Sequence, residues 1–136
     1  MTMKSINVAV AVIINDKGEV LLTQRYEPKN PSVHLSWQLP GGGVEKNESI
    51  EDACIREALE ETGFKIKLLS PKPHLIVSRY EKRDYLLNGF KAQVISGTIN
   101  TELDQETADA RWFKIEDIKH LRTLKDTDTM VEACNI

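Results

Sequence analysis

One short stretch constrains this sequence more than any other: a glycine-rich segment that runs into an acidic helix. Three consecutive glycines, Gly41–Gly43, precede the helix. Ser49 and Asp52 have the spacing of an N-terminal capping box, which predicts that the helix begins near Ile50. Gly63 can adopt the left-handed conformation that ends a helix. The sequence therefore specifies both ends of this helix locally.

The predicted helix carries three carboxylates close together on one side. At about 100° per residue, this side begins with Ala53 and Cys54 and continues with Glu57, Glu60 and Glu61. A second apolar side carries Ile55, Ala58, Leu59 and Thr62. The acidic end is expected at the rim of a packed interface, where the carboxylates repel one another. A hard divalent cation, Mg²⁺ or Mn²⁺, would relieve this repulsion because it prefers carboxylate and water oxygens.

An acidic helix face taken alone is more often solvated, with Arg56 and Glu60 as an ordinary i,i+4 ion pair. The complete string argues against that reading, because it matches in register the pattern Gx5Ex7REUXEEXGU, where U is apolar. The matching residues are Gly42, Glu48, Arg56, Glu57, Glu60, Glu61 and Gly63. Ala58, although small, and Phe64 fill the apolar positions. The pattern is the signature of the Nudix hydrolases, and the flanking segments 21–25 and 37–42 also resemble this family.

The resemblance implies hydrolysis of a nucleoside diphosphate linked to another moiety, by attack of water on phosphorus. It assigns catalytic roles to Arg56, Glu57, Glu60 and Glu61, with Mg²⁺ or Mn²⁺ as the cofactor. Metal ions held by carboxylates can neutralise the charge that develops in phosphoryl transfer and can position the water. Glu57 and Glu61 are expected to chelate the metal, and the glutamate that acts as the base differs among family members. Glu48 is expected to pair with Arg56 and to orient the ligands.

Two further positions are assigned to the metal site by the same resemblance. A carbonyl of the glycine segment often completes the metal shell in the family, and here it is expected at Gly42. A further carboxylate comes from the region 101–109 in many relatives. Glu106 is the predicted ligand, in preference to Asp104 and Asp109.

Candidate substrate contacts are less specific. Arg25 occupies a position where the family often has a phosphate-contacting arginine, although a strand-end arginine that reaches solvent fits equally well. Tyr80 lies roughly where some dinucleoside polyphosphate hydrolases carry a tyrosine, although an aromatic residue at a strand end more often serves packing. His34 is alone in a polar loop, where histidine is more often solvated than catalytic. The predicted substrate is a nucleoside triphosphate or a related nucleotide derivative.

Composition limits the other function classes. The 136 residues are expected to form a single domain, residues 1–136, and the net charge of −3 argues against binding of a nucleic acid polymer. No apolar run is long enough for a membrane span, and the N-terminus lacks a secretory pattern, so a cytoplasmic enzyme without a membrane partner is expected. Cys54 and Cys134 lack metal-ligand or redox spacing. The sequence leaves a homodimer open.

The order of the predicted elements indicates an α/β fold. Strands are predicted over residues 6–14, 19–26, 37–39, 65–69, 75–80, 85–95 and 108–114. A hairpin turn at 15–18 is expected to join the first two strands. A second helix is predicted over 116–124, with a short helical turn in the tail 126–136. These elements give a mixed β-sheet between helices, in agreement with the α/β/α sandwich of the Nudix fold.

Two non-catalytic classes compete with this interpretation. A Nudix-fold nucleotide-binding module would keep the fold without the metal ligands, whereas all carboxylates of the signature are present here. A plain acidic interaction domain would require the match to the signature to be accidental. Hydrolysis of a panel of nucleotides with and without Mg²⁺ distinguishes the three classes.

Overall fold

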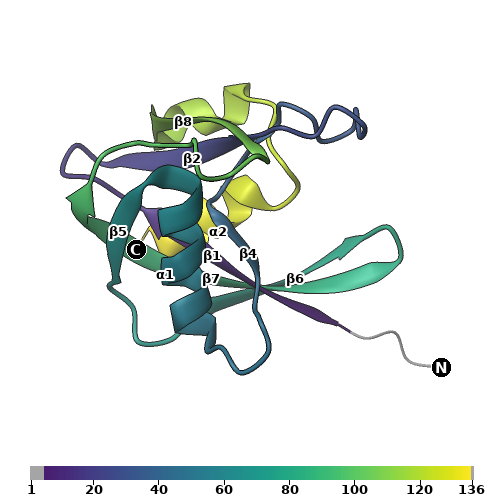
Figure 1. The fold of residues 1–136 in the computed structure, drawn as a ribbon, viewed down its shortest axis with the longest axis horizontal. Helices are drawn as coiled ribbons and strands as arrows, with labels where there is room; N and C mark the ends of the chain where they lie inside the picture. The colour runs from purple at the N-terminus through teal and green to yellow at the C-terminus, as the bar shows by residue number, and fades with distance from the viewer. Residues whose placement is uncertain (1–4, 136) are drawn as a thin grey trace.

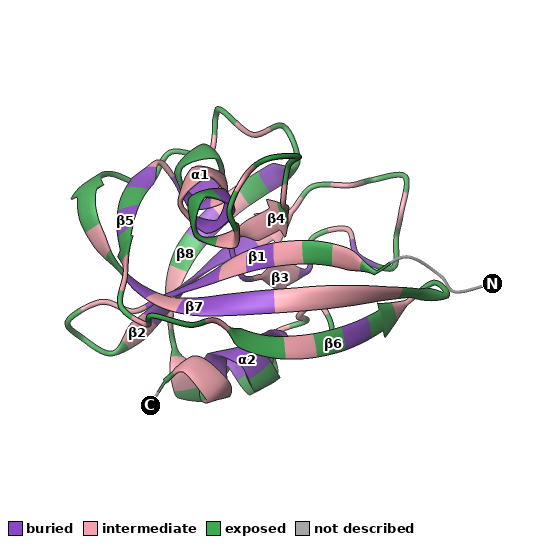
Figure 2. Cartoon of the chain, turned by 90° about the horizontal axis from the view of Figure 1, so that it is seen from below, coloured by how far each residue is buried: buried purple, intermediate pink, exposed green. Residues whose placement is uncertain are grey.

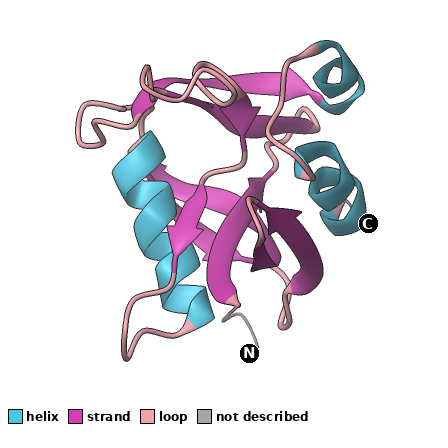
Figure 3. Ribbon diagram, turned by 90° about the vertical axis from the view of Figure 1, so that its right-hand side faces the viewer, coloured by secondary structure: helices cyan, strands magenta, loops and turns pink. Residues whose placement is uncertain are grey.

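A computed structural model describes residues 5–135 as two β-sheets with helices packed against them (Figure 1, Figure 3). The strands are β1 (Ile6–Ile13), β2 (Glu19–Arg25), β3 (Trp37–Gln38), β4 (Gly41–Gly43), β5 (Phe64–Leu68), β6 (His74–Tyr80), β7 (Arg83–Gly97) and β8 (Thr107–Lys114). The helices are α1 (Ile50–Thr62), the 3₁₀ helix η1 (Ile115–His120) and α2 (Thr127–Cys134). The predicted α/β class with a mixed sheet is confirmed. No helix among the described residues is long and apolar enough to cross a membrane.

The larger sheet is built around β7. β1 pairs with β7 in parallel and with β4 in antiparallel orientation. On its other side, the 15-residue β7 pairs first with β6 and then with β5, both antiparallel. The smaller sheet is antiparallel, in the order β3-β2-β8. Both sheets therefore join early strands of the chain to late ones.

The core has two clusters, one on each side of the sheets. Figure 2 shows β1 and β7 side by side between α1 and α2. On β1, Ala11 and Ile13 belong to the cluster beneath α1, whereas Val12 belongs to the cluster that includes Met130 of α2. On β2, Leu21 faces the first cluster and its neighbours face the second. The almost continuous apolar sequence of these strands follows from burial on both faces.

Helix α1 begins and ends where the sequence predicts. The Ser49 hydroxyl accepts a hydrogen bond from the Asp52 amide at 3.0 Å. Gly63 has φ 83° and donates its N–H to the Leu59 carbonyl. The prediction is wrong for the Leu59 side chain, which is 46% exposed. The helix buries Ala53, Cys54, Ala58, Glu61 and Thr62 instead, because it packs on a single side.

Two expectations about the first part of the chain are corrected. The turn at 15–18 forms, but β1 and β2 enter different sheets, and within residues 5–135 their pairing is limited to an isolated bridge between Ile14, just after β1, and Val20. The glycine segment Gly41–Gly43, for which no strand was predicted, is a strand paired with β1. A Cβ atom on Gly41 would collide with the Ala9 carbonyl oxygen, so the close pairing depends on the missing side chain.

The predicted second helix over 116–124 is also corrected. Only Ile115–His120 is helical, as a 3₁₀ helix, and the chain then becomes extended at Leu121. Trp37 explains the change, because its N–H donates to the Arg122 carbonyl and its carbonyl accepts from the Leu124 amide, both at 2.9 Å. The second α-helix lies in the tail, as α2.

Candidate active site

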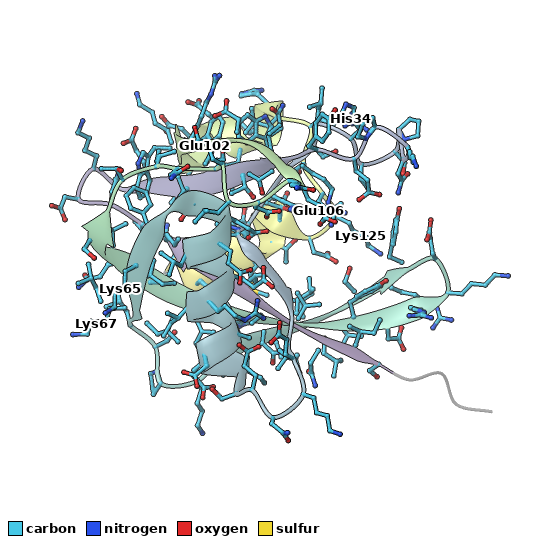
Figure 4. All side chains as sticks on the ribbon, viewed as in Figure 1. His34, Lys65, Lys67, Glu102, Glu106 and Lys125 are labelled. Atoms are coloured by element: carbon cyan, nitrogen blue, oxygen red, sulfur yellow. The ribbon has the colours of Figure 1, made fainter. Side chains whose placement is uncertain are left out.

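A cleft of about 400 Å³ lies where the acidic end of α1 meets β4, the smaller sheet and the segment before β8. That segment carries Glu102 and Glu106, as Figure 4 shows. The cleft brings together six residues predicted from the sequence: Arg25, Gly42, Glu57, Glu60, Glu61 and Glu106. It is also lined by Gln38, Leu103 and Asp104. The sequence analysis assigned no role to Gln38 or Leu103.

Arg56 connects the helix to the segment that precedes it. Its Nε and Nη2 atoms donate to the two carboxylate oxygens of Glu48, at 2.7 and 3.0 Å. Its Nη2 also donates to the Gly43 carbonyl at 3.3 Å, and its Nη1 donates to Glu57 at 3.0 Å and Glu60 at 3.3 Å. The hydrogen bond from Arg56 lowers the pKa of Glu48. The structure thus contains the predicted pair of Arg56 and Glu48.

Glu61 is the most buried carboxylate of the cleft, with 5% of its surface exposed. Its Oε2 accepts a hydrogen bond from the Gly41 N–H at 2.6 Å, so the side chain fixes β4 against α1. Burial raises the pKa of Glu61 well above its ordinary value, and the charges of Glu57 and Asp104 act in the same direction. A cation beside Glu61 would therefore stabilise the ionised form of this carboxylate.

Glu57 lies directly against the backbone of Gly42. A Cβ atom added to Gly42 would stand 2.7 Å from both Cδ and Oε1 of Glu57, so only glycine leaves room for this carboxylate. Burial also raises the pKa of Glu57, although Arg56 opposes this effect. The contribution of the Gly42 carbonyl to the metal site stays a prediction.

The donors in the cleft fit a hard divalent cation. Glu57, Glu60, Glu61 and Glu106 offer carboxylate oxygens from two sides, and Mg²⁺ and Mn²⁺ prefer such ligands. Within residues 5–135, no three Asp, Glu, His or Cys side chains already converge as a metal-ligand set. Glu57 and Glu60 instead contact Arg56, and Glu61 contacts Gly41. Binding of a cation at the predicted ligands would therefore require these side chains to turn.

The carboxylates before β8 and at its beginning differ in their surroundings. Asp104 accepts hydrogen bonds from the Glu106 amide and the Thr107 hydroxyl, both at 2.9 Å, and so shapes its own turn. The Glu106 carboxylate lines the cleft and makes no hydrogen bond or ion pair among the described residues. Asp109 lies outside the cleft lining and pairs with Arg111 at 2.7 Å. Glu106 therefore lines the cleft as expected, and its role as a metal ligand stays a prediction.

The other candidate contact residues, Arg25, Tyr80 and His34, lie in three different places. Arg25 lines the cleft, and its only ion pair among the described residues is a long contact of 3.8 Å with Glu27. Tyr80 is paired with Arg83 at the end of the β6–β7 hairpin, outside the residues that line the cleft. The Nδ1 atom of His34 accepts from the Glu27 amide at 3.0 Å, which gives this histidine a structural contact in its loop.

We expect Arg56→Ala to lower kcat by about 10- to 100-fold, because the orientation of Glu57 and of the glycine strand depends on its guanidinium. Arg56→Lys should recover little, since lysine cannot reproduce the two parallel bonds to Glu48. The control is Arg111→Ala, which removes an exposed arginine that pairs with Asp109 outside the cleft. Steady-state kinetics would contradict this role if Arg56→Ala had the wild-type kcat.

Comparisons with known proteins assign nearly the whole chain to one protein family. A family described as NUDIX domain matches residues 3–134. The chain is 32% identical over 120 residues to nucleoside diphosphate-linked moiety X motif 6 of Xenopus laevis, covering 85% of this chain and 52% of that protein. It is 40% identical over 75 residues to an RNA pyrophosphohydrolase of Pasteurella multocida, covering 53% of this chain and 35% of the relative. The chain thus spans about a third to a half of the length of these relatives.

A solved structure supports the same grouping. A NUDIX hydrolase from Nitrosomonas europaea superposes with a TM-score of 0.80 at 27% identity, covering 95% of this chain and 87% of the other. The agreement extends over nearly the full length of both chains.

Proposed function

The chain belongs to the Nudix hydrolase family, and from this premise we propose that it is a divalent-metal-dependent hydrolase of nucleotides. It cleaves a pyrophosphate bond in a nucleoside diphosphate linked to another moiety, with a nucleoside triphosphate or a related derivative as substrate. The observation that carries the proposal is that Glu57, Glu60 and Glu61 line one cleft together with the backbone of Gly42.

The predicted site residues have different roles in this reaction. Glu57 and Glu61 would hold the metal, with Glu60, Glu106 and the Gly42 carbonyl as further ligands. A bound Mg²⁺ or Mn²⁺ supplies positive charge to the phosphate oxygens and increases the acidity of water. A carboxylate of the cluster accepts the proton of the attacking water. Arg25 lies at the same cleft, and among the described residues its guanidinium has a single ion pair, which is long, so it can turn towards a phosphate.

The test is a panel of nucleotides incubated with the protein in Mg²⁺, in Mn²⁺ and with a chelator. The panel contains nucleoside triphosphates, dinucleoside polyphosphates, nucleotide sugars and RNA with a 5′-triphosphate. Release of phosphate, pyrophosphate or a nucleoside monophosphate from at least one compound, abolished by the chelator, is expected. Nucleotide binding without hydrolysis of any compound would instead identify a non-catalytic binding module.

The carboxylate cluster also predicts a pH dependence. Burial raises the pKa of Glu57 and Glu61, so in the metal-free protein their contribution to stability is present below about pH 4.3 and is lost as the pH rises through the raised values. A divalent cation requires the ionised forms, so its binding should release protons in mildly acidic buffer. The increase in Tm on adding Mg²⁺ should therefore be larger at pH 8 than at pH 5.5, and activity should rise towards alkaline pH.

Two measurements check this prediction. Calorimetric titration of Mg²⁺ at pH 5.5 in two buffers of different ionisation enthalpy counts the released protons. Thermal unfolding with and without Mg²⁺ across the pH range gives the dependence of Tm. An increase in Tm that is the same at every pH, with no proton release, would contradict metal binding at these glutamates.

A further inference from the structure

The loop between β2 and β3, residues 26–36, is held by the side chain of one distant residue, Arg122. The Nη1 atom of Arg122 donates to the His34 carbonyl at 2.9 Å. Its Nη2 atom donates to the carbonyls of Pro31 and Ser32, at 2.7 and 2.8 Å. The guanidinium therefore bonds to three backbone carbonyls of a loop that lies 88 to 91 residues earlier in the sequence. This arrangement uses the planar donor fork of arginine, which lysine lacks.

A single peptide group joins Arg122 to Arg25. Its carbonyl, which belongs to His34, accepts from Arg122. Its N–H, which belongs to Leu35, donates to the Arg25 carbonyl at 2.7 Å. The Arg25 N–H donates to the Ser36 carbonyl at 2.9 Å, so both backbone groups of Arg25 are bonded to the end of the loop. Because a peptide group is planar and rigid, a shift of its carbonyl also moves its N–H. The position of the Arg25 backbone therefore depends on Arg122.

Leu35 has a backbone conformation that needs support. Its φ is 63°, in the left-handed region that residues other than glycine adopt rarely. The other non-glycine residues with positive φ among residues 5–135 are polar or charged. Such a conformation persists only where the surrounding structure holds it, and it occurs most often at functional sites. The two hydrogen bonds of the peptide before Leu35 provide this support.

The end of β2 is also bonded to the segment on the other side of the cleft. The Tyr26 N–H donates to the Glu106 carbonyl at 2.7 Å. Arg25 and Glu106 both line the cleft, whereas Arg122 is absent from its lining among the described residues. Arg122 also lies outside the segment of the family signature. Any effect of its side chain on the reaction must therefore pass through the residues that it holds.

We propose that Arg122 is a positioning residue that holds Arg25 where it can bind a phosphate group of the substrate. This inference rests on the proposed function, because the role of Arg25 presupposes a phosphate in the cleft. With Arg122 in place, the Arg25 side chain extends from a fixed backbone. Without it, Leu35 can return to an ordinary φ, and the hydrogen bond from its N–H to the Arg25 carbonyl is lost.

The experiment compares Arg122→Ala, Arg25→Ala and the double variant with the wild-type protein. KM and kcat are measured for the compound of the nucleotide panel that the wild type hydrolyses fastest. Calorimetry in Mg²⁺ gives the dissociation constant of inorganic tripolyphosphate with methylene groups in place of both bridging oxygens, which resists hydrolysis. Arg122→Ala should raise KM and this dissociation constant by about 3- to 10-fold and leave kcat within about twofold. Arg25→Ala should raise both by about 10-fold or more.

The double variant tests whether Arg122 acts through Arg25. Once Arg25 is alanine, loss of the Arg122 side chain should have no further effect, so the double variant should match Arg25→Ala within about twofold. A compensating change provides a second test. Asparagine adopts the left-handed region more readily than leucine, so Leu35→Asn should restore part of the affinity that Arg122→Ala loses.

Two checks separate this role from a general loss of structure. Arg122→Ala should remain folded, because the bonds between its backbone and Trp37 do not involve the side chain. If it does not fold, Arg122→Lys takes its place, since lysine keeps the charge and lacks the donor fork. The matched control is Arg111→Ala, which removes an exposed arginine outside the cleft lining and should change neither KM nor the dissociation constant.

Wild-type affinity in Arg122→Ala would overturn the inference. Effects of Arg122→Ala and Arg25→Ala that add in the double variant would also overturn it, because Arg122 would then act independently of Arg25. Failure of the inference remains distinct from failure of the proposed function. Wild-type protein that hydrolyses the panel while the two arginines show no coupling refutes only the role of Arg122. Wild-type protein that neither binds nor hydrolyses any nucleotide refutes both.

Discussion

Replacement of Glu57 or Glu61 by glutamine should reduce kcat by about 100-fold or more at saturating Mg²⁺, because groups that stabilise transition-state charge have effects of this size. Glutamine preserves the size of each side chain, and at position 61 it keeps an oxygen that can accept from the Gly41 N–H. The decrease in kcat would therefore result from the missing negative charge. Metal titrations should show weaker binding in both variants.

The thermal stability of the same variants provides a second check, because Tm is expected to stay the same or rise while activity falls. Burial raises the pKa of Glu61, which means that the ionised form is unfavourable in the metal-free fold. Glu61→Gln should therefore have a Tm at pH 7, without metal, that equals or exceeds the wild-type value. The control is Glu51→Gln, an exposed position in the first turn of α1, which should change neither activity nor metal affinity. Wild-type metal affinity in both Glu57→Gln and Glu61→Gln would refute the assigned site.

Gly42→Ala should reduce kcat by about 10- to 100-fold, whereas Gly43→Ala should remain within about twofold of wild type. A Cβ atom at Gly42 would stand 2.7 Å from the Glu57 carboxylate, while a Cβ atom at Gly43 meets no atom within 4 Å. Neither glycine has a positive φ, so strain in the backbone does not distinguish the two substitutions. The two variants differ only in whether the new methyl group displaces Glu57.

Steady-state kinetics and metal titration of both alanine variants measure this difference. Circular dichroism should show that both are folded, because Gly42 and Gly43 are partly exposed. Equal activity of the two variants would show that the close contact between Gly42 and Glu57 has no role in the reaction.

The sequence predicts best where neighbouring residues determine the structure. The ends of α1 depend on Ser49, Asp52 and Gly63, which act within one turn of the helix, and both were predicted. The paired residues Arg56 and Glu48 are also close in sequence, eight residues apart. The family signature identified the carboxylates that the fold brings to one cleft, because they occupy one side of a single helix.

Features that depend on distant parts of the chain were missed. The strand Gly41–Gly43 exists because β1 pairs with it, and no local pattern of glycines predicts a strand. The extended conformation at 121–124 depends on the backbone of Trp37, more than eighty residues earlier. Arg122 appears unremarkable in the sequence, and its hydrogen bonds to the loop before β3 form only when residues 88 to 91 positions apart meet.

The strand pairings have a consequence for how the protein is made. β1 pairs with residues 85–92 and β2 pairs with residues 107–114. The longest pairings of the first two strands are therefore with strands from the later part of the chain. On the ribosome, α1 and its glutamates emerge well before β8 and before the Arg122 carbonyl that holds Trp37. Contacts this distant in sequence slow folding, and the cleft can assemble only after β8 has been synthesised. A nascent chain stalled before β8 would expose the apolar faces of β1 and β2, which makes it a substrate for chaperones.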